Sequence, residues 1–257
     1  MSDDMHNEHD DAVPPNATPP SPRPPSALPP SAMLPGGRDP QGDDRKVPRG
    51  RHGQPREKIA AIQRARILDA FVNEVGDAGL DGAHVAHICA AAGVSTKEFY
   101  AVFHSKDECF LAAFEMGAEV ICNAAHDAYE DTNGPWEDKV RSAITAMLGA
   151  LEGNPAYARL SVMEVYQAGP AGLAKLTEVI GRIRQILGGG DPKPPPGLPG
   201  DAFESTLVGI GFHPMGEYVA AGKADRLTEL VPVLTYSLAL PVVGPERAAR
   251  QLHPSAG

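Results

Sequence analysis

The sequence predicts an all-α fold in which two helical domains follow a long N-terminal arm. Residues 82–106 have the pattern of two short helices joined by a tight turn and followed by the start of a third. From residue 106 to about residue 240, apolar residues recur at helical intervals. The interruptions are Asn133-Gly134-Pro135, Asn154-Pro155 and Gly169-Pro170, which end one helix and begin the next.

The N-terminal arm, residues 1–55, is predicted to be disordered. It contains half of all the prolines and almost no large apolar side chains. A segment of this composition cannot bury enough apolar surface to offset the entropy cost of ordering. The arm also lacks the basic start and apolar core of a signal peptide, so we expect a cytoplasmic protein.

The charges are distributed unevenly along the chain. Residues 1–44 hold eight acidic and two basic side chains, residues 45–66 hold eight basic and one acidic, and residues 67–257 hold twenty-four acidic and thirteen basic. DNA binding needs only a local positive surface, and the basic run that includes Arg56 provides one. We interpret this run as an arm for the DNA backbone or minor groove; the alternative is a solvated tail.

The segment 82–106 has helix-turn-helix spacing. Ile88 and Ala92 form the apolar face of the first helix, and Gly93 ends it where a left-handed residue is needed. Ser95 with Glu98, and Ser105 with Glu108, match the capping-box pattern at the starts of the next two helices.

The second helix of this motif is predicted to divide into a buried face and an outward face. Phe99 and Phe103 fall on the core side, which leaves Thr96, Lys97 and Tyr100 toward solvent. These three side chains are hydrogen-bond donors suited to phosphates and base edges. The pattern therefore favours a nucleic-acid interface.

Over roughly fifty residues the chain resembles the TetR family of bacterial transcriptional repressors. The resemblance begins near Arg64 and runs through Gly79, Ala92-Gly93-Val94-Ser95, Phe99-Tyr100 and Phe103-x-Ser105-Lys106 to Phe114. It implies a helix-turn-helix DNA-binding domain over 56–114 and a helical ligand-binding and dimerisation domain over 115–244. Residues 245–257 are left as a flexible tail.

The resemblance also implies which residues meet double-stranded operator DNA. Ser95, Thr96 and Lys97 lie where the family reads bases and phosphates, and Tyr100 and Lys106 match positions that contact the backbone. The chain departs from the family at three positions, with His84 for a common threonine, Val102 for a histidine or tyrosine, and His104 for a proline. Val102 removes one expected phosphate contact, so either His84, His104 and the basic arm compensate for it or the affinity for DNA is modest.

The predicted second domain begins with a long helix from Ser105 that connects the two domains. Further helices are expected over 135–152, 157–166, 173–187 and 203–221, with a last one over 225–240 that is kinked or restarted at Pro232. The last two helices are apolar over wide faces. We interpret those faces as a homodimer interface built as a four-helix bundle, as the resembled family forms; an intramolecular core is the alternative.

The resemblance further implies a pocket for a small-molecule effector between the connecting helix and the dimer helices. The candidates combine aromatic area, adaptable thioethers and a few polar groups. They are Trp136, Met147, Tyr157, Met163, Glu164, Tyr166, Phe212, His213 and Met215. Glu164 and His213 would be the most informative pair if both were buried, since a buried carboxylate needs a partner.

Other functions find little support. His84, His87 and Cys89 invite a zinc site, but Cys89 does not share the face of the two histidines. No catalytic constellation or dinucleotide loop is present, and we expect no enzyme activity, metal or cofactor. The longest apolar run, 230–243, is short for a bilayer and contains two prolines. The main alternative is a non-enzymatic helical scaffold or sensor that no longer binds DNA specifically.

Overall fold

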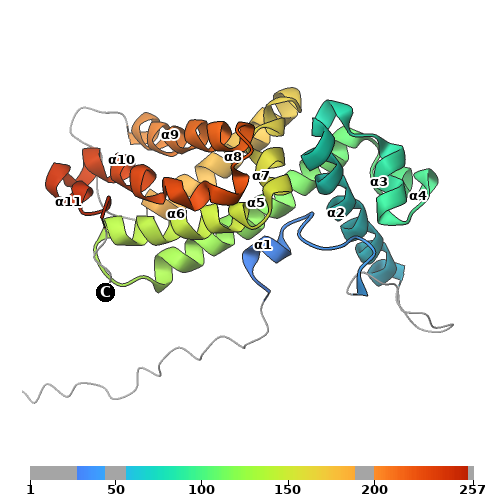
Figure 1. Cartoon of the computed structure of the whole chain (residues 1–257), viewed down its shortest axis with the longest axis horizontal. Coiled ribbons are helices and arrows are strands. Elements are labelled where there is room, and N and C mark those ends of the chain that lie inside the picture. Colours follow the sequence, from blue (N-terminus) through green and yellow to red (C-terminus); the bar gives the residue numbers. More distant parts are fainter. Residues whose placement is uncertain (1–27, 44–55, 189–199, 254–257) are drawn as a thin grey trace, which may run out of the picture.

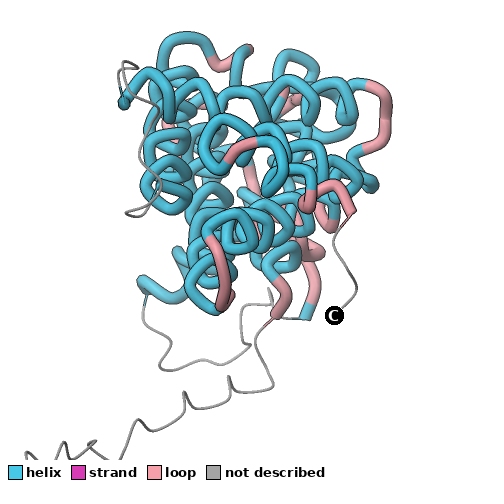
Figure 2. Tube along the Cα trace, turned by 90° about the vertical axis from the view of Figure 1, so that its left-hand side faces the viewer, coloured by secondary structure: helices cyan, strands magenta, loops and turns pink. Residues whose placement is uncertain are grey.

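The computed structural model describes residues 28–43, 56–188 and 200–253. Within these ranges the chain folds into helices joined by short loops, with no strand (Figures 1 and 2). The α-helices are α1 (Pro30–Met33), α2 (Arg56–Gly82), α3 (Val85–Ala92), α4 (Thr96–Val102), α5 (Lys106–Asp131), α6 (Trp136–Glu152), α7 (Pro155–Val162), α8 (Gly169–Gly188), α9 (Gly200–Ala220), α10 (Val231–Val243) and α11 (Pro245–Ala249). Two short 3-10 helices are η2 (Glu164–Tyr166) and η3 (Ala224–Leu230). The all-α prediction is confirmed.

Helices α2, α3 and α4, with the first turns of α5, form a small unit that we call the head. Its core contains Phe71 of α2, Ile88 of α3, Phe99 of α4 and Phe110 of α5, all fully buried. Figure 1 shows the head at one end of the molecule, with α3 and α4 at its outer edge. Burying each of these four side chains contributes about 1.5–3 kcal/mol to the stability of the head.

The remaining helices, from the middle of α5 to α11, form the body. Helix α5 passes from the head into the body, as the sequence predicts, and packs along α6 and α8. Gly117 allows Tyr157 of α7 to approach α5 closely, because a Cβ at position 117 would lie 2.1 Å from the Tyr157 ring. The Tyr157 hydroxyl, fully buried, donates a 2.7 Å hydrogen bond to the Phe114 carbonyl. Helix α7 is thereby fixed against the connecting helix.

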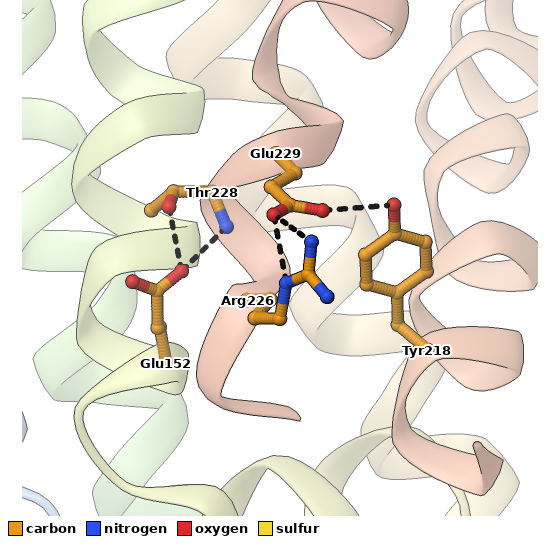
Figure 3. Close-up of polar contacts among 5 residues, drawn as sticks. All are labelled: Glu152, Tyr218, Arg226, Thr228 and Glu229. Carbon is orange, nitrogen blue, oxygen red and sulfur yellow. Dashed lines mark hydrogen bonds and ion pairs between the residues drawn. The ribbon is translucent and has the colours of Figure 1, made fainter. Parts of the chain in front are cut away.

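The last long helix predicted from the sequence is divided in two. The chain forms η3 and then α10, and Pro232 in the first turn of α10 marks the restart. A polar network holds this junction: Glu152 at the end of α6 accepts hydrogen bonds from the Thr228 backbone N–H at 2.7 Å and from its hydroxyl at 2.6 Å. Beside it, Glu229 pairs with Arg226 and accepts from the Tyr218 hydroxyl of α9 (Figure 3). The network fixes α9 and η3 relative to α6.

Among the described residues, one stretch, Ala224–Val243, is long and apolar enough to span a membrane. It is divided between η3 and α10, and Leu227, Leu230 and Leu234 are buried in the core of the body. A core helix of a folded domain meets the same criteria of length and composition. We therefore assign this stretch to the core.

The prediction of disorder over residues 1–55 is wrong for residues 28–43. This segment contains α1 and packs on both head and body, with Leu34 only 1% exposed. The composition argument failed because a single buried leucine and a few backbone hydrogen bonds anchor the segment to residues far away in the sequence. Residues 1–27 and 44–55 lie outside the described residues.

The prediction of a flexible tail from residue 245 is also wrong as far as residue 253. Helix α11 packs on α10, and Arg247 donates two hydrogen bonds, 2.9 and 2.7 Å long, to the buried carboxylate of Glu137 on α6. Gln251 then donates to Asp138 at 2.7 Å. Arg247 and Glu137, 110 residues apart in sequence, hold the C-terminal segment in place. An argument from local composition cannot detect a contact between such distant residues.

Candidate nucleic-acid interface and effector pocket

The start of α4 has the predicted capping box. The Ser95 hydroxyl accepts from the Glu98 backbone N–H at 3.2 Å, and Glu98 Oε2 accepts from the Ser95 backbone N–H at 2.7 Å. The hydrogen bonds that the Ser95 backbone N–H and hydroxyl donate to the Glu98 carboxylate lower the pKa of Glu98. Gly93 ends α3 in the left-handed region at φ 62°, so the chain turns sharply between the two helices. The first turn of α4 is therefore held in one conformation.

The outward face of α4 is the predicted one. Thr96 and Lys97 are exposed and Tyr100 is half exposed, whereas Phe99 is fully buried. The Tyr100 ring packs edge-to-face on Phe99 with centroids 5.3 Å apart, which anchors the base of a ring whose outer part reaches solvent. Three hydrogen-bonding side chains thus share one accessible surface of a short rigid helix.

His84 and His104, the two histidines expected to assist DNA binding, both lie on the head, each beside a carboxylate. The His84 backbone N–H donates to Glu74 at 3.4 Å, and the His84 ring packs against that of His87, which contacts Glu74 at 2.9 Å. His104 Nδ1 lies 2.9 Å from Glu108 Oε2. Among the described residues, no group of three or more His, Cys, Asp or Glu side chains is arranged to hold a metal ion.

Lys106 takes part in the internal structure of the head. Its ammonium donates to the carbonyls of Leu80 at 2.6 Å and Ala83 at 3.3 Å, at the C-terminal end of α2. A cation at this position satisfies carbonyls that lack helical partners and complements the helix dipole. Lys106 therefore has a structural role, whatever contact it makes with DNA.

The basic run before the motif continues into α2, which begins at Arg56. Arg64 lies over the Phe103 ring, 4.6 Å from its centroid, and Arg66 donates to the Gly93 carbonyl at 3.4 Å. These two arginines thus help to pack the motif. The side chain of Arg56 and the basic residues at 45–51 lie outside the described residues.

A buried ionic contact, which we call the clasp, joins the head to the body. Glu164 of η2, 6% exposed, accepts from the Leu80 backbone N–H at 2.9 Å through Oε2 and from Arg159 Nε at 3.0 Å through Oε1. Arg159 also donates to the Gly76 carbonyl at 3.0 Å. Gly79 allows this close approach: it kinks α2 at φ 76°, and a Cβ there would lie 3.1 Å from the Arg159 guanidinium.

The body contains an apolar pocket between α6, α8, α9 and α10. Its free volume is about 50 Å³. The lining residues are Ile144, Met147, Leu148, Ile183, Leu187, Ile210, Gly211, Phe212, Met215, Leu234 and Leu238. Pockets for drug-sized molecules usually measure about 300–1,000 Å³. A ligand of that size can enter only if these helices move apart.

A more open groove of about 590 Å³ lies between α9 and the α7–η2 segment. Its lining residues are Val162, Met163, Tyr166, Gly209, Phe212, His213, Gly216, Glu217 and Ala220. Phe212 belongs to both linings and therefore separates the apolar pocket from the groove. Met163 of the groove directly precedes Glu164 of the clasp.

The structure divides the nine residues predicted for the effector pocket into three groups. Met147, Phe212 and Met215 line the apolar pocket, and Met163, Tyr166 and His213 line only the groove. The remaining three use their polar atoms internally: Tyr157 on Phe114, Glu164 in the clasp, and Trp136, whose Nε1 donates to the Leu187 carbonyl at 2.7 Å.

Glu164 is buried but His213 is not, so the condition under which the two would be an informative pair is not met. The carboxylate of Glu164 already has two partners, and the His213 side chain is 84% exposed beside Glu217. The prediction also missed the aliphatic lining residues such as Ile144, Ile183 and Leu234. Their signal was the helical apolar stripes, which were assigned to helix packing or, for Leu234, to the dimer interface.

Comparison with known proteins agrees with this architecture. Residues 67–113 match the family model described as bacterial regulatory proteins, tetR family. No curated protein matched the chain.

Three solved structures have the same fold as this chain. The fatty acid degradation regulator FadR from Bacillus halodurans has a TM-score of 0.60 and 18% identity, over 73% of this chain and 96% of that one. The transcriptional regulator FadR from Bacillus subtilis in complex with stearoyl-CoA has a TM-score of 0.59 and 19% identity, over 72% and 98%. A TetR-like transcriptional regulator from Rhodococcus sp. RHA1 has a TM-score of 0.51 and 20% identity, over 72% and 97%.

Proposed function

Because residues 67–113 match the model of the tetR family of bacterial regulatory proteins, we propose that this chain is a homodimeric, non-enzymatic repressor of that family. In this proposal α4 binds an operator, and an effector with a large apolar part releases it. The observation that carries the proposal is the capped helix α4, with Thr96, Lys97 and Tyr100 exposed on one face.

The proposed DNA contacts divide by chemistry. Ser95, Thr96 and Lys97 stand at the N-terminal end of α4, where backbone N–H groups and the helix dipole favour phosphate and where side chains enter the major groove. Tyr100, one helical turn further along α4, contacts the DNA backbone. The body carries an acidic excess, so the contacts must come from the head and from the basic run before it.

Homodimer formation through α9 and α10 is supported by apolar residues on their surfaces. Ile210 of α9 is 42% exposed and Val233 of α10 is 46% exposed, although both helices otherwise contribute to the core of the body. A two-fold pair of these helices forms a four-helix bundle that covers such residues. A dimer also presents two α4 helices to half-sites about 34 Å apart on one duplex, a gain that a single chain lacks.

The effector class follows from the apolar pocket and its neighbours. The lining is aliphatic, with Phe212 and two methionines as adaptable parts, so it suits a hydrocarbon chain rather than a charged group. The similar Bacillus subtilis regulator was solved with stearoyl-CoA, which supports an acyl chain as the apolar part. We therefore propose an acyl-CoA or a related long-chain molecule as the effector.

We propose that η2 couples effector binding in the body to release of DNA by the head. An effector that separates α8 and α9 displaces Phe212, which packs beside Val162 and Met163 in the groove lining. Glu164 follows Met163 directly and holds the Leu80 N–H of the head. A coupling of about 1–3 kcal/mol between the two sites lowers operator affinity roughly five- to 150-fold.

The experiment is a gel-shift assay with the DNA upstream of the chain's own coding region, followed by titration with stearoyl-CoA. The proposal predicts a complex of two chains per site that dissociates as stearoyl-CoA is added, while coenzyme A alone has no effect. Absence of any specific complex, with this fragment and with fragments selected from a random pool, would refute the assignment of α4 as a DNA reader.

A further inference from the structure

Residues 28–43 form a segment that we call the strap, because it runs across the junction between head and body. In Figure 1 the strap, drawn in blue, passes from α1, beside α5, to the base of α2. It precedes the DNA-binding motif and belongs to neither domain. Its contacts fall into three groups.

The first group of contacts is with the body. Leu34, 1% exposed, belongs to the same core cluster as the residues of α5 and α6. Asn154, at the start of α7, donates a 3.1 Å hydrogen bond from Nδ2 to the Pro35 carbonyl. Ser31 lies so close to Gly153 that a Cβ at position 153 would be 2.6 Å from the Ser31 Cβ. The strap therefore sits on the α6–α7 connection.

The second group is with α2. The Gly36 backbone N–H donates to Oδ1 of Asp69 at 2.9 Å, and the Asp69 carboxylate is 1% exposed. Gly36 has φ 81°, and a Cβ there would lie 2.7 Å from a methyl group of Val72. Only glycine meets both requirements, a left-handed backbone and contact with α2 at this distance.

The third group is with the helix-turn-helix motif itself. Gln41 Nε2 donates to the carbonyls of Ala91 at 3.0 Å and Ala90 at 3.3 Å, which lie at the C-terminal end of α3. Arg66 joins the strap to the turn, because it donates to the Pro40 carbonyl at 3.1 Å and to the Gly93 carbonyl at 3.4 Å. The strap thus caps the helix that precedes α4.

We propose that the strap is an intramolecular brace that holds the head at a fixed angle to the body and opposes the head movement by which an effector releases DNA. The three groups of contacts are rigidly spaced along sixteen residues, so a head that rotates relative to α6 and α7 must break one group. The regulatory part of this inference rests on the proposed function, whereas the mechanical part concerns the chain alone.

The test compares two substitutions at neighbouring strap positions. Leu34→Asp places a charge in the core and detaches the strap, while Met33→Asp makes the same chemical change at a side chain that is 51% exposed. Neither alters a residue of the head or the body. Gln41→Ala is a milder second variant that removes only an exposed side chain, so it is expected to leave folding intact.

Single-molecule energy transfer measures the head-to-body distance directly. Dyes are attached through Ala101→Cys on α4 and Glu130→Cys on α5, in labelled protein mixed with excess unlabelled chain. Both positions are exposed, while Cys89, Cys109 and Cys122 are buried and burial raises the pKa of their thiols, so labelling is selective.

The brace predicts that the distance distribution broadens for Leu34→Asp, broadens less for Gln41→Ala, and is unchanged for Met33→Asp. It also predicts that Leu34→Asp lowers the stearoyl-CoA concentration for half-maximal operator release at least fivefold. An unchanged distance distribution in both Leu34→Asp and Gln41→Ala overturns the inference. If the distribution broadens but stearoyl-CoA releases no DNA even from the unaltered protein, the brace stands and the proposed effector class is wrong.

Discussion

Glu164 Oε2 and the backbone N–H of Leu80, 84 residues apart in sequence, are joined by a buried hydrogen bond of 2.9 Å. This contact connects the α7–η2 segment, which lines the groove beside α9, to the end of the helix that supports the DNA-binding motif. It therefore lies on a covalent and hydrogen-bonded route from the groove to the head.

Replacing Glu164 is expected to destabilise the chain and uncouple its two functions. Glu164→Ala leaves the Leu80 N–H and part of the Arg159 guanidinium without partners, at a cost of about 1–3 kcal/mol for the buried donor. Urea unfolding should show this loss, and operator release by stearoyl-CoA should weaken. The control, Glu178→Ala, removes an exposed partner of Lys175 and should change stability by less than about 1 kcal/mol. Equal effects of the two substitutions would argue against the clasp.

Replacing Gly79 and replacing Gly149 by alanine are expected to change the stability of the chain in opposite directions. Gly79→Ala forces a side chain into the left-handed region at φ 76° and toward the Arg159 guanidinium, which costs about 1–2 kcal/mol. Gly149 lies inside α6 with no neighbour within 4 Å of a built Cβ, so Gly149→Ala should stabilise by about 0.5–1 kcal/mol. Thermal unfolding of both variants distinguishes the signs. A gain in stability from Gly79→Ala would contradict the kink.

The Glu137–Arg247 pair predicts a specific pH dependence of stability. Burial alone would raise the pKa of Glu137, but hydrogen bonds from Arg247 and the charges of Arg247 and Arg250 outweigh it, and the net pKa is lowered. A lowered pKa in the folded state means that the stabilisation is present above the ordinary value of about 4.3 and is lost as pH falls through the lowered value.

Urea unfolding at pH 6 and at pH 3.5 measures this contribution. When the pH falls from 6 to 3.5, the unaltered chain should lose more stability than the Arg247→Met variant, in which the pKa of Glu137 is no longer held down. Glu98 and Glu108 also have lowered pKa values and add to the decline in both proteins equally, so the difference between the two reports the pair. Identical pH profiles would show that the α11 contact is absent in solution.

Filling the apolar pocket is expected to block the effector without affecting DNA. Gly211→Leu places a side chain in a pocket of about 50 Å³, where a Cβ has only Leu234 within 4 Å, and should weaken stearoyl-CoA binding at least tenfold. The control, Gly181→Leu, changes a glycine of α8 that has no neighbour within 4 Å of a built Cβ.

Trp136 provides the readout for this prediction. It is the single tryptophan of the chain, and its indole N–H donates to Leu187, which lines the pocket. Tryptophan emission should therefore shift on titration with stearoyl-CoA in the unaltered chain and in Gly181→Leu. A full shift in Gly211→Leu at the same concentrations would place the ligand elsewhere.

The parts of the fold that could be predicted from the sequence are those encoded by neighbouring residues. The α4 cap needs only Ser95, Glu98 and the bend at Gly93, all within six positions, and the exposed face of α4 follows from the spacing of Phe99 and Phe103. Helical apolar stripes likewise predicted the helices of the body, and Pro232 signalled the restart of the last one.

What could not be predicted depends on contacts between distant residues. The strap is fixed by Asp69 and Asn154, which lie 33 and 119 positions from their strap partners, and nothing near Leu34 in sequence signals that it is buried. The pocket prediction favoured aromatic and polar side chains, but Tyr157 and Glu164 use those groups to hold the fold. The lining is instead mostly aliphatic, and such residues look alike whether they fill a core or border a pocket.

The most direct measurement of the central claim is the affinity of the operator fragment for the unaltered chain and for a Lys97→Ala, Tyr100→Phe double variant, across a series of salt concentrations. Both side chains are exposed on α4, so folding should be unaffected. We predict weaker binding and a salt dependence reduced by about one unit of slope per protomer. The control is Lys223→Ala, which removes an exposed charge of the body, between α9 and η3, outside the helix-turn-helix motif. Affinity and slope equal to those of the unaltered chain would contradict the assignment of this helix face to DNA.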